Sequence, residues 1–76
     1  MKRELNIFFD FLSKNEGVSI FKFNSETLQI DMDTFNAISR LAKKNNLIEV
    51  KNDRIYLTDS AKVKLASNIL TIEDLL

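Results

Sequence analysis

The chain contains no cysteine and no histidine, and these absences exclude much of protein chemistry. Without cysteine it forms neither disulfides nor thiolate metal sites, and without histidine it lacks the commonest acid–base group and metal ligand at neutral pH. Its carboxylates show no metal-binding or catalytic spacing, and it has no glycine-rich loop. We therefore expect neither an enzyme nor a protein that binds a metal or a cofactor.

The sequence also has no proline, one glycine (Gly17) and no polar low-complexity tract, so it offers no obvious linker. Its 76 residues are enough for one small domain, and 45% hydrophobic with 29% charged residues is a typical globular composition. We expect residues 1–76 to form a single domain.

No apolar run approaches the roughly 20 residues that a membrane span needs. The opening Met1–Glu4 is followed by a segment containing Asn6 and Asp10, unlike the apolar core of a secretory signal. We expect an intracellular, cytoplasmic protein without a membrane partner.

Eleven basic and eleven acidic side chains give a net charge of zero, but their distribution is uneven. Residues 34–64 hold seven basic and three acidic side chains, residues 1–33 hold four and six, and residues 65–76 hold two acidic ones. The middle of the chain is therefore basic and its ends are acidic.

The first helix is indicated by apolar side chains at helical spacing: Leu5, Phe8, Phe9 and Leu12. This stripe predicts a helix over residues 3–15, with a stop at Asn15–Gly17. Ile7 and Phe11 form a second apolar stripe on another face, which needs a partner of its own.

The next segment allows two structures. Its β-branched and aromatic content favours a short strand over Ser19–Phe23, followed by a brief helix capped by Asn24 or Ser25 and ending near Gln29. Ser19 suits equally well the cap of a helix that runs to Leu28.

A helix from Asp33 to Lys44 separates apolar from polar side chains clearly. Its apolar face carries Phe35, Ile38, Leu41 and Ala42, and its polar face carries Asn36, Ser39, Arg40, Lys43 and Lys44. Asp31 or Asp33 caps its start, and Asn45-Asn46 suits its end because asparagine tolerates left-handed backbone.

Residues 48–57 predict a β-hairpin with a two-residue turn at Asn52-Asp53. The register then pairs Lys51 with Arg54, Val50 with Ile55, Glu49 with Tyr56 and Ile48 with Leu57. In this register Ile48, Val50, Ile55 and Leu57 all point to one face of the hairpin, and Glu49, Lys51, Arg54 and Tyr56 all point to the other.

A last helix is expected after the hairpin, capped by Thr58 or Asp59. Its predicted core-facing stripe is Val63, Ala66 and Leu70, which leaves Leu65 and Ile69 without a partner.

This order of elements is that of a winged helix-turn-helix, and residues 17–66 resemble MarR-like transcriptional regulators. Asp31–Val50 is similar to their recognition helix and first wing strand, and Arg54–Asp59 is similar to their second wing strand. The resemblance implies an α+β fold with three main helices, a short strand and a two-stranded wing. It also implies sequence-specific binding of double-stranded DNA by a small transcriptional regulator.

The polar face of the recognition helix has side chains suited to DNA. Arg40 suits guanine, Asn36 suits adenine, Ser39 suits either base, and Lys43 and Lys44 suit phosphate. A solvated helix surface would carry similar residues, because arginine and lysine are good helix formers and mostly exposed. Asp33 either caps the helix or accepts a hydrogen bond from cytosine, and capping is the interpretation we favour.

The wing tip favours the DNA-binding interpretation, because Lys51 opposite Arg54 is a like-charge pair that costs stability unless it binds an anion. Tyr56 on the outer face either binds a phosphate or serves as a strand residue. We expect Phe21 and Phe23 in the core rather than in a base-stacking platform.

The two unpartnered apolar stripes predict a homodimer through Ile7, Phe11, Leu65 and Ile69. Alternatively, the stripes cover each other within one chain, with Ile72, Leu75 and Leu76 as a lid. Pairing would let two recognition helices contact two half-sites about one DNA turn apart.

A second function stays open, since a winged helix can also serve as a protein-interaction module such as an adaptor or inhibitor of a larger complex. Charge placement separates the two functions. Arg40, Lys43, Lys51 and Arg54 exposed on one face favour DNA, whereas ion pairs that consume them favour a protein partner.

Overall fold

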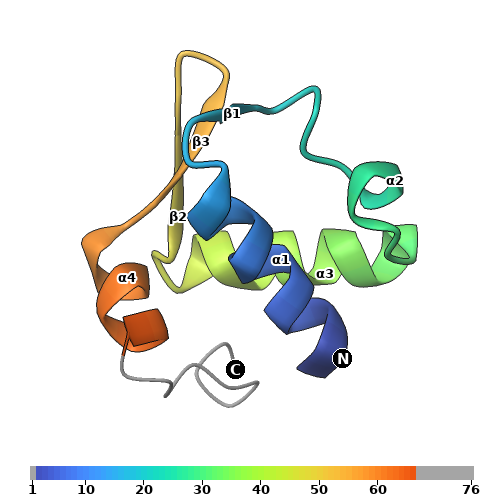
Figure 1. Cartoon of the computed structure of the whole chain (residues 1–76), viewed down its shortest axis with the longest axis horizontal. Helices are drawn as coiled ribbons and strands as arrows, with labels where there is room; N and C mark the ends of the chain where they lie inside the picture. Colours follow the sequence, from blue (N-terminus) through green and yellow to red (C-terminus); the bar gives the residue numbers. More distant parts are fainter. Residues whose placement is uncertain (1, 67–76) are drawn as a thin grey trace.

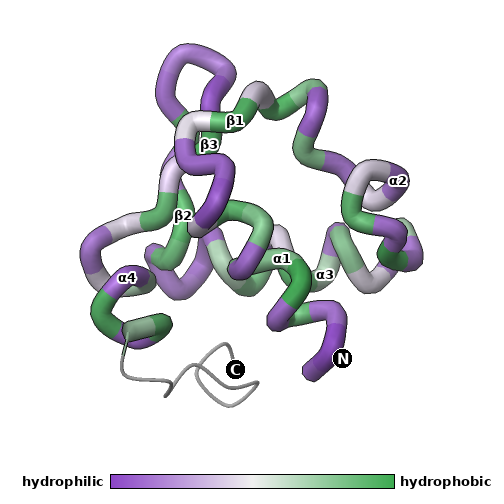
Figure 2. Tube along the Cα trace, viewed as in Figure 1, coloured by the Kyte–Doolittle hydropathy of each residue, from purple (hydrophilic) through white to green (hydrophobic). Residues whose placement is uncertain are grey.

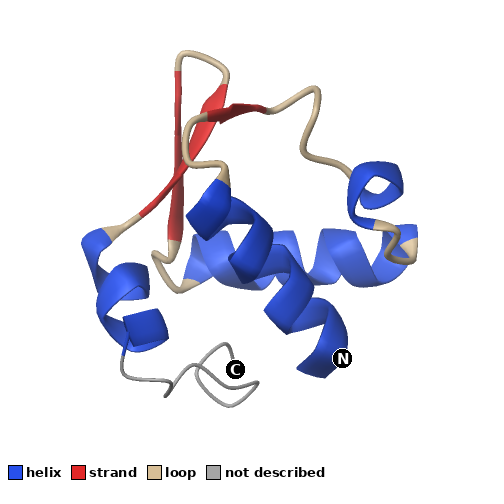
Figure 3. Ribbon diagram, in the orientation of Figure 1, coloured by secondary structure: helices blue, strands red, loops and turns tan. Residues whose placement is uncertain are grey.

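The computed structural model describes residues 2–66, which form an α+β arrangement of four helices and a three-stranded antiparallel sheet (Figure 1). The elements in chain order are α1 (Lys2–Lys14), β1 (Val18–Ser19), α2 (Ser25–Leu28), α3 (Met32–Lys44), β2 (Ile48–Lys51), β3 (Arg54–Leu57) and α4 (Asp59–Ala66). Helix α1 packs against α3, and the β2–β3 hairpin extends away from this helical layer (Figure 3). Within the described residues, no helix is long and apolar enough to cross a membrane.

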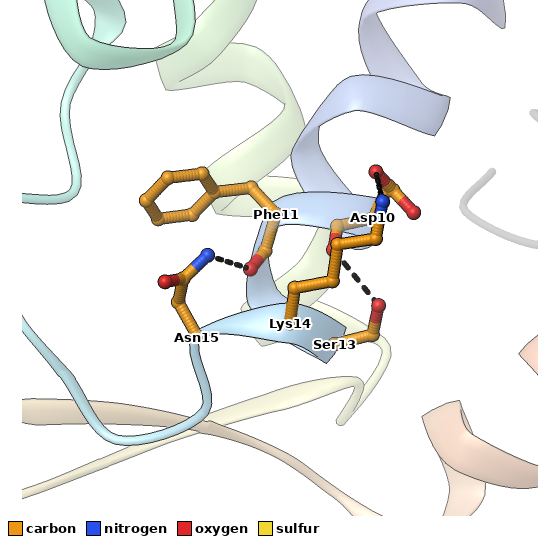
Figure 4. A network of polar contacts seen from close by, with 5 residues as sticks. All are labelled: Asp10, Phe11, Ser13, Lys14 and Asn15. Atoms are coloured by element: carbon orange, nitrogen blue, oxygen red, sulfur yellow. Dashed lines mark hydrogen bonds and ion pairs between the residues drawn. The ribbon is translucent and has the colours of Figure 1, made fainter.

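Helix α1 confirms the predicted first helix and supplies the centre of the core. The side chains of its first apolar stripe are fully buried: Leu5, Phe8, Phe9 and Leu12. In the last turns of α1, side chains donate hydrogen bonds to backbone carbonyls (Figure 4). Ser13 Oγ donates to the Asp10 carbonyl at 2.8 Å, and Asn15 Nδ2 donates to the Phe11 carbonyl at 3.0 Å. Lys14 adds an ion pair to Asp10 at 3.2 Å.

Phe23 joins α1 to α3 through an aromatic cluster. Its ring centroid lies 4.9 Å from that of Phe8, 5.2 Å from that of Phe35 and 5.7 Å from that of Phe11. The contacts to Phe8 and Phe35 are edge-to-face, which is a preferred aromatic geometry. The prediction that Phe23 belongs to the core is confirmed.

The segment after α1 is a shorter strand than predicted, and a helix from Ser19 to Leu28 is wrong. Strand β1 ends at Ser19, because the Ser19 hydroxyl accepts from the amide of Phe21 at 3.2 Å and its carbonyl accepts from the amide of Lys22 at 3.0 Å. These bonds close a turn. Asn24 then caps α2 as expected, with Oδ1 accepting from the Thr27 amide at 2.8 Å.

The hairpin has the predicted register, with Lys51 paired to Arg54 at the tip. Asn52 and Asp53 both have positive φ, at 51° and 62°, as a type I′ turn requires. The hydrophilic turn forms the far end of the hairpin in Figure 2. Val50 shares the face of its partner Ile55, as predicted, but it is 46% exposed whereas Ile55 is buried.

Strand β1 lies on the other side of β3, so the sheet order is β1-β3-β2. Val18 pairs with Ile55 and Ser19 with Arg54, and the Ile20 amide donates to the Asp53 carbonyl at 2.9 Å. The hydrogen bond from Ile20 to Asp53 connects the loop after β1 to the hairpin turn.

Helix α4 begins where predicted but turns a different face inward. Thr58 caps it, with Oγ1 accepting from the Ala61 amide at 3.2 Å while the same hydroxyl donates to the Asn46 carbonyl at 2.7 Å. Ala61 is fully buried and Leu65, one turn later, packs against the core. The predicted stripe is therefore wrong, since Val63 is 63% exposed and Ala66 is also exposed.

Three of the four residues predicted at a homodimer interface pack against the core of the described chain. Ile7, Phe11 and Leu65 are partly buried against the core, and the Phe11 ring stacks on Phe23 at an interplanar angle of 25°. Ile69, the fourth predicted interface residue, lies outside the described residues together with Leu70 and the predicted lid. The expectation that Ile7, Phe11 and Leu65 point away from the core is corrected.

Candidate functional site

Helix α3 starts at a cap formed by Asp31, not by Asp33. The Asp31 carboxylate accepts from the amides of Asp33 and Thr34 at 3.1 and 3.2 Å. This leaves the exposed side chain of Asp33 in the first turn of the helix without a capping role. The favoured interpretation of Asp33 as the cap is therefore wrong.

The two faces of α3 agree with the prediction. Ile38 and Ala42 are fully buried, and the side chains of Asn36, Arg40 and Lys43 are exposed on the opposite side. Ser39 is half-buried and lies at the border between the faces, and Lys44 is exposed in the last turn.

The helix ends at Asn45-Asn46, as predicted. The Asn45 amide donates to the Leu41 carbonyl at 3.0 Å, and Asn46 has a left-handed φ of 57°. The amide of Leu47 then donates to the Ala42 carbonyl at 2.8 Å, which directs the chain from α3 into the core and the hairpin.

The cations of α3 are available to a ligand. Among residues 2–66, Arg40, Lys43 and Lys44 have neither an ion pair nor a side-chain hydrogen bond. Lys43 and Lys44 lie at the carboxyl end of α3, where the helix dipole stabilises positive charge, whereas Asp31 and Asp33 lie at the amino end. The charged side chains of α3 are therefore acidic at its amino end and basic at its carboxyl end, an arrangement that compensates the helix dipole.

A groove of about 430 Å³ separates α3 from the hairpin. Its polar wall consists of Asn36, Ser39 and Lys43 on α3. The remainder is apolar and is formed by Ile20, Phe23, Phe35, Ile48, Val50 and Ile55. The structure thus brings three of the predicted DNA-binding residues together beside the exposed Val50.

The hairpin tip is less available than predicted. Arg54 Nη1 donates to the Gly17 carbonyl at 2.9 Å, and Lys51 Nζ lies 3.9 Å from a carboxylate oxygen of Glu49. The Arg54 bond fastens β3 to the start of β1, so this guanidinium has a structural role that sequence spacing did not reveal. Lys51 has only a long, exposed ion pair, which contributes little to stability.

Tyr56 lies apart from the residues of α3. It is half-buried on the outer face of the hairpin, where its Cε1 atom is 3.3 Å from the position that a Cβ at Gly17 would occupy. Glycine is favoured at position 17 for two reasons: its φ is +83°, and a side chain there would crowd the Tyr56 ring. The packing of Tyr56 supports its interpretation as a strand residue.

A second hollow, of about 460 Å³, lies between the outer face of the hairpin and α4. Within it Lys62 Nζ pairs with Glu16 Oε1 at 2.9 Å, and this hydrogen bond, strengthened by the charge of Glu16, raises the pKa of Lys62 above its ordinary value of 10.5. One cation of the basic middle of the chain is therefore used to hold α4 to the loop after α1.

The exposure of two apolar side chains, Phe21 and Met32, was not predicted from the sequence. Phe21, expected in the core, is 77% exposed because the turn closed by Ser19 prevents Phe21 and Phe23 from sharing a face. Met32, the first residue of α3, is 64% exposed. Its position four residues before Asn36 is the signal that would have placed it on the exposed face.

No protein-family model, curated protein or solved structure matches this chain. Among residues 2–66 there is also no group of three or more histidine, cysteine, aspartate or glutamate side chains that could hold a metal ion. The features of the chain that bear on function are therefore the geometry and charge of α3 and the hairpin.

Proposed function

We propose that this protein is a winged helix that binds double-stranded DNA sequence-specifically, with α3 in the major groove, and acts as a small transcriptional regulator. The observation that carries the proposal is the exposed face of α3, where Arg40, Lys43 and Lys44 have no partner among the described residues. The element order and the hairpin after α3 are compatible with this fold.

In this proposal the exposed face of α3 supplies both base and phosphate contacts. Arg40 makes a bidentate contact to guanine, Asn36 pairs with adenine, and Ser39 bonds to either base from the wall of the groove. Lys43 and Lys44, at the carboxyl end, bind phosphates.

The hairpin has a smaller part than α3. Lys51 reaches the DNA backbone from the tip, and Arg54 contributes less because one of its donors is engaged by the Gly17 carbonyl. Tyr56 makes no DNA contact in this arrangement because it lies on the outer face over Gly17.

Mobility-shift titration on a random duplex pool, followed by selection of bound sequences, tests the proposal. Arg40→Ala should weaken binding to the selected site by about 1–3 kcal/mol while leaving the folded structure intact. Lys14→Ala is the matched control, because it removes an exposed cation from α1. Equal affinities for the wild type and Arg40→Ala would overturn the assignment.

Protein interaction is the second candidate function, and the exposed Phe21 together with the apolar part of the groove favours it. A protein-interaction module would show no salt-dependent binding of duplex DNA. The same titration therefore separates the two functions.

A further inference from the structure

Met32 presents an apolar side chain to solvent at the start of the helix that we propose to contact DNA. It is 64% exposed and does not belong to the hydrophobic core. Its neighbours Asp31 and Asp33 are acidic, and the Asp31 carboxylate caps the helix. The start of α3 therefore combines an apolar side chain with negative charge.

Met32, Asn36 and Arg40 form one row along the exposed face of α3. They are four residues apart, and four residues rise about 6 Å along an α-helix. Base pairs are stacked about 3.4 Å apart, so consecutive members of the row reach positions roughly two base pairs apart. The row changes from a thioether to an amide and then to a guanidinium.

The charges of α3 determine which of its ends lies over base edges. Asp31 and Asp33 repel phosphate, whereas Lys43 and Lys44 attract it. In this proposal the amino end of α3 avoids the DNA backbone and lies within the major groove of the DNA, and the carboxyl end lies against the DNA backbone. At the amino end, the apolar group that the major groove offers to Met32 is the C5 methyl of thymine.

We propose that Met32 is a specificity-determining residue that contacts a thymine methyl. The preferred site for one chain then presents thymine, adenine and guanine in that order from the amino to the carboxyl end of α3, about two base pairs apart, each on either strand. This inference rests on the proposed DNA-binding function and adds to it the position and chemistry of one base.

The test replaces the thymine contacted by Met32 with uracil, which removes only the C5 methyl group. Sequences selected by the wild type locate the thymine, and titration on the thymine and uracil versions of the duplex measures the value of the methyl. We expect about a fourfold loss for the wild type, the value of one buried methylene-sized group. For Met32→Ala we expect the two duplexes to bind equally.

Val63→Ala is the matched control, since it shortens a similarly exposed apolar side chain on α4 and should keep the wild-type response to uracil. Circular dichroism checks that each variant is folded. A wild type indifferent to uracil, or a Met32→Ala variant that still loses about fourfold, would overturn the inference while leaving DNA binding in place. A wild type that selects no sequence would refute the proposed function, and the inference with it.

Discussion

Asp33 is the one acidic residue of helix α3, and the other charged residues of this helix are basic. Because Asp31 is the cap, Asp33 is not needed to start the helix. Its carboxylate contributes to stability only through the helix dipole, about 0.3–1 kcal/mol. The structure thus shows that Asp31 and not Asp33 caps the helix, a distinction that the sequence did not provide.

We expect Asp33→Asn to raise affinity for all duplexes by up to about 1 kcal/mol at low salt, because it removes a charge that repels phosphate. Titrations at two salt concentrations measure the change, and Glu26→Gln on α2 is the control. A loss of affinity confined to selected sequences would instead mean that Asp33 accepts a hydrogen bond from cytosine.

At the scale of elements, the hairpin shows what sequence alone can predict. Its register follows from a two-residue turn and an alternating pattern, both of which are local. The role of Arg54 could not be predicted in this way, because its partner Gly17 is 37 residues away. The same holds for Phe21, whose exposure depends on a turn made by Ser19, and for α4, whose inward face depends on how Thr58 docks at Asn46.

The two hairpin cations should therefore behave differently. Arg54→Ala is expected to lower the free energy of unfolding by about 0.5–1.5 kcal/mol, because it removes the hydrogen bond to Gly17. Lys51→Ala should change stability by less than about 0.5 kcal/mol and weaken DNA binding at all sequences. Urea denaturation and DNA titration of both variants measure these effects, and equal stability losses would contradict the assignment.

The Lys62–Glu16 ion pair connects α4 to the loop after α1 and gives stability a pH dependence. The pKa of Lys62 is raised by its hydrogen bond to Glu16, so the folded state holds this proton more tightly than the unfolded state. The contribution is fully present at neutral pH and is lost as pH rises above about 10.5. The difference in melting temperature between wild type and Lys62→Gln should therefore shrink from pH 9 to pH 11, and a constant difference would contradict this account.

At the scale of the whole molecule, the predicted homodimer requires that its interface residues be free of the chain's own core. Phe11 was predicted at a dimer interface but stacks on Phe23. Phe11→Asp should therefore act on folding and lower the free energy of unfolding by roughly 1–3 kcal/mol. Sedimentation equilibrium and urea denaturation check this. If the wild type is a dimer and Phe11→Asp converts it to a stable monomer, Phe11 belongs to a dimer interface and this account is wrong.

The whole molecule has zero net charge, so bulk charge cannot carry DNA binding and a local set of cations must do so. The proposed phosphate contacts are Lys43, Lys44 and Lys51. Each phosphate contact adds about −0.9 to the slope of log affinity against log salt concentration, which predicts a slope of roughly −3.

Fluorescence anisotropy with the selected duplex between 50 and 200 mM salt measures this slope most directly. We predict a slope near −3 for the wild type, reduced in magnitude by about 1 in Lys43→Ala and unchanged in Lys14→Ala. Absence of binding, or a slope that Lys43→Ala leaves unaltered, would contradict DNA recognition by α3.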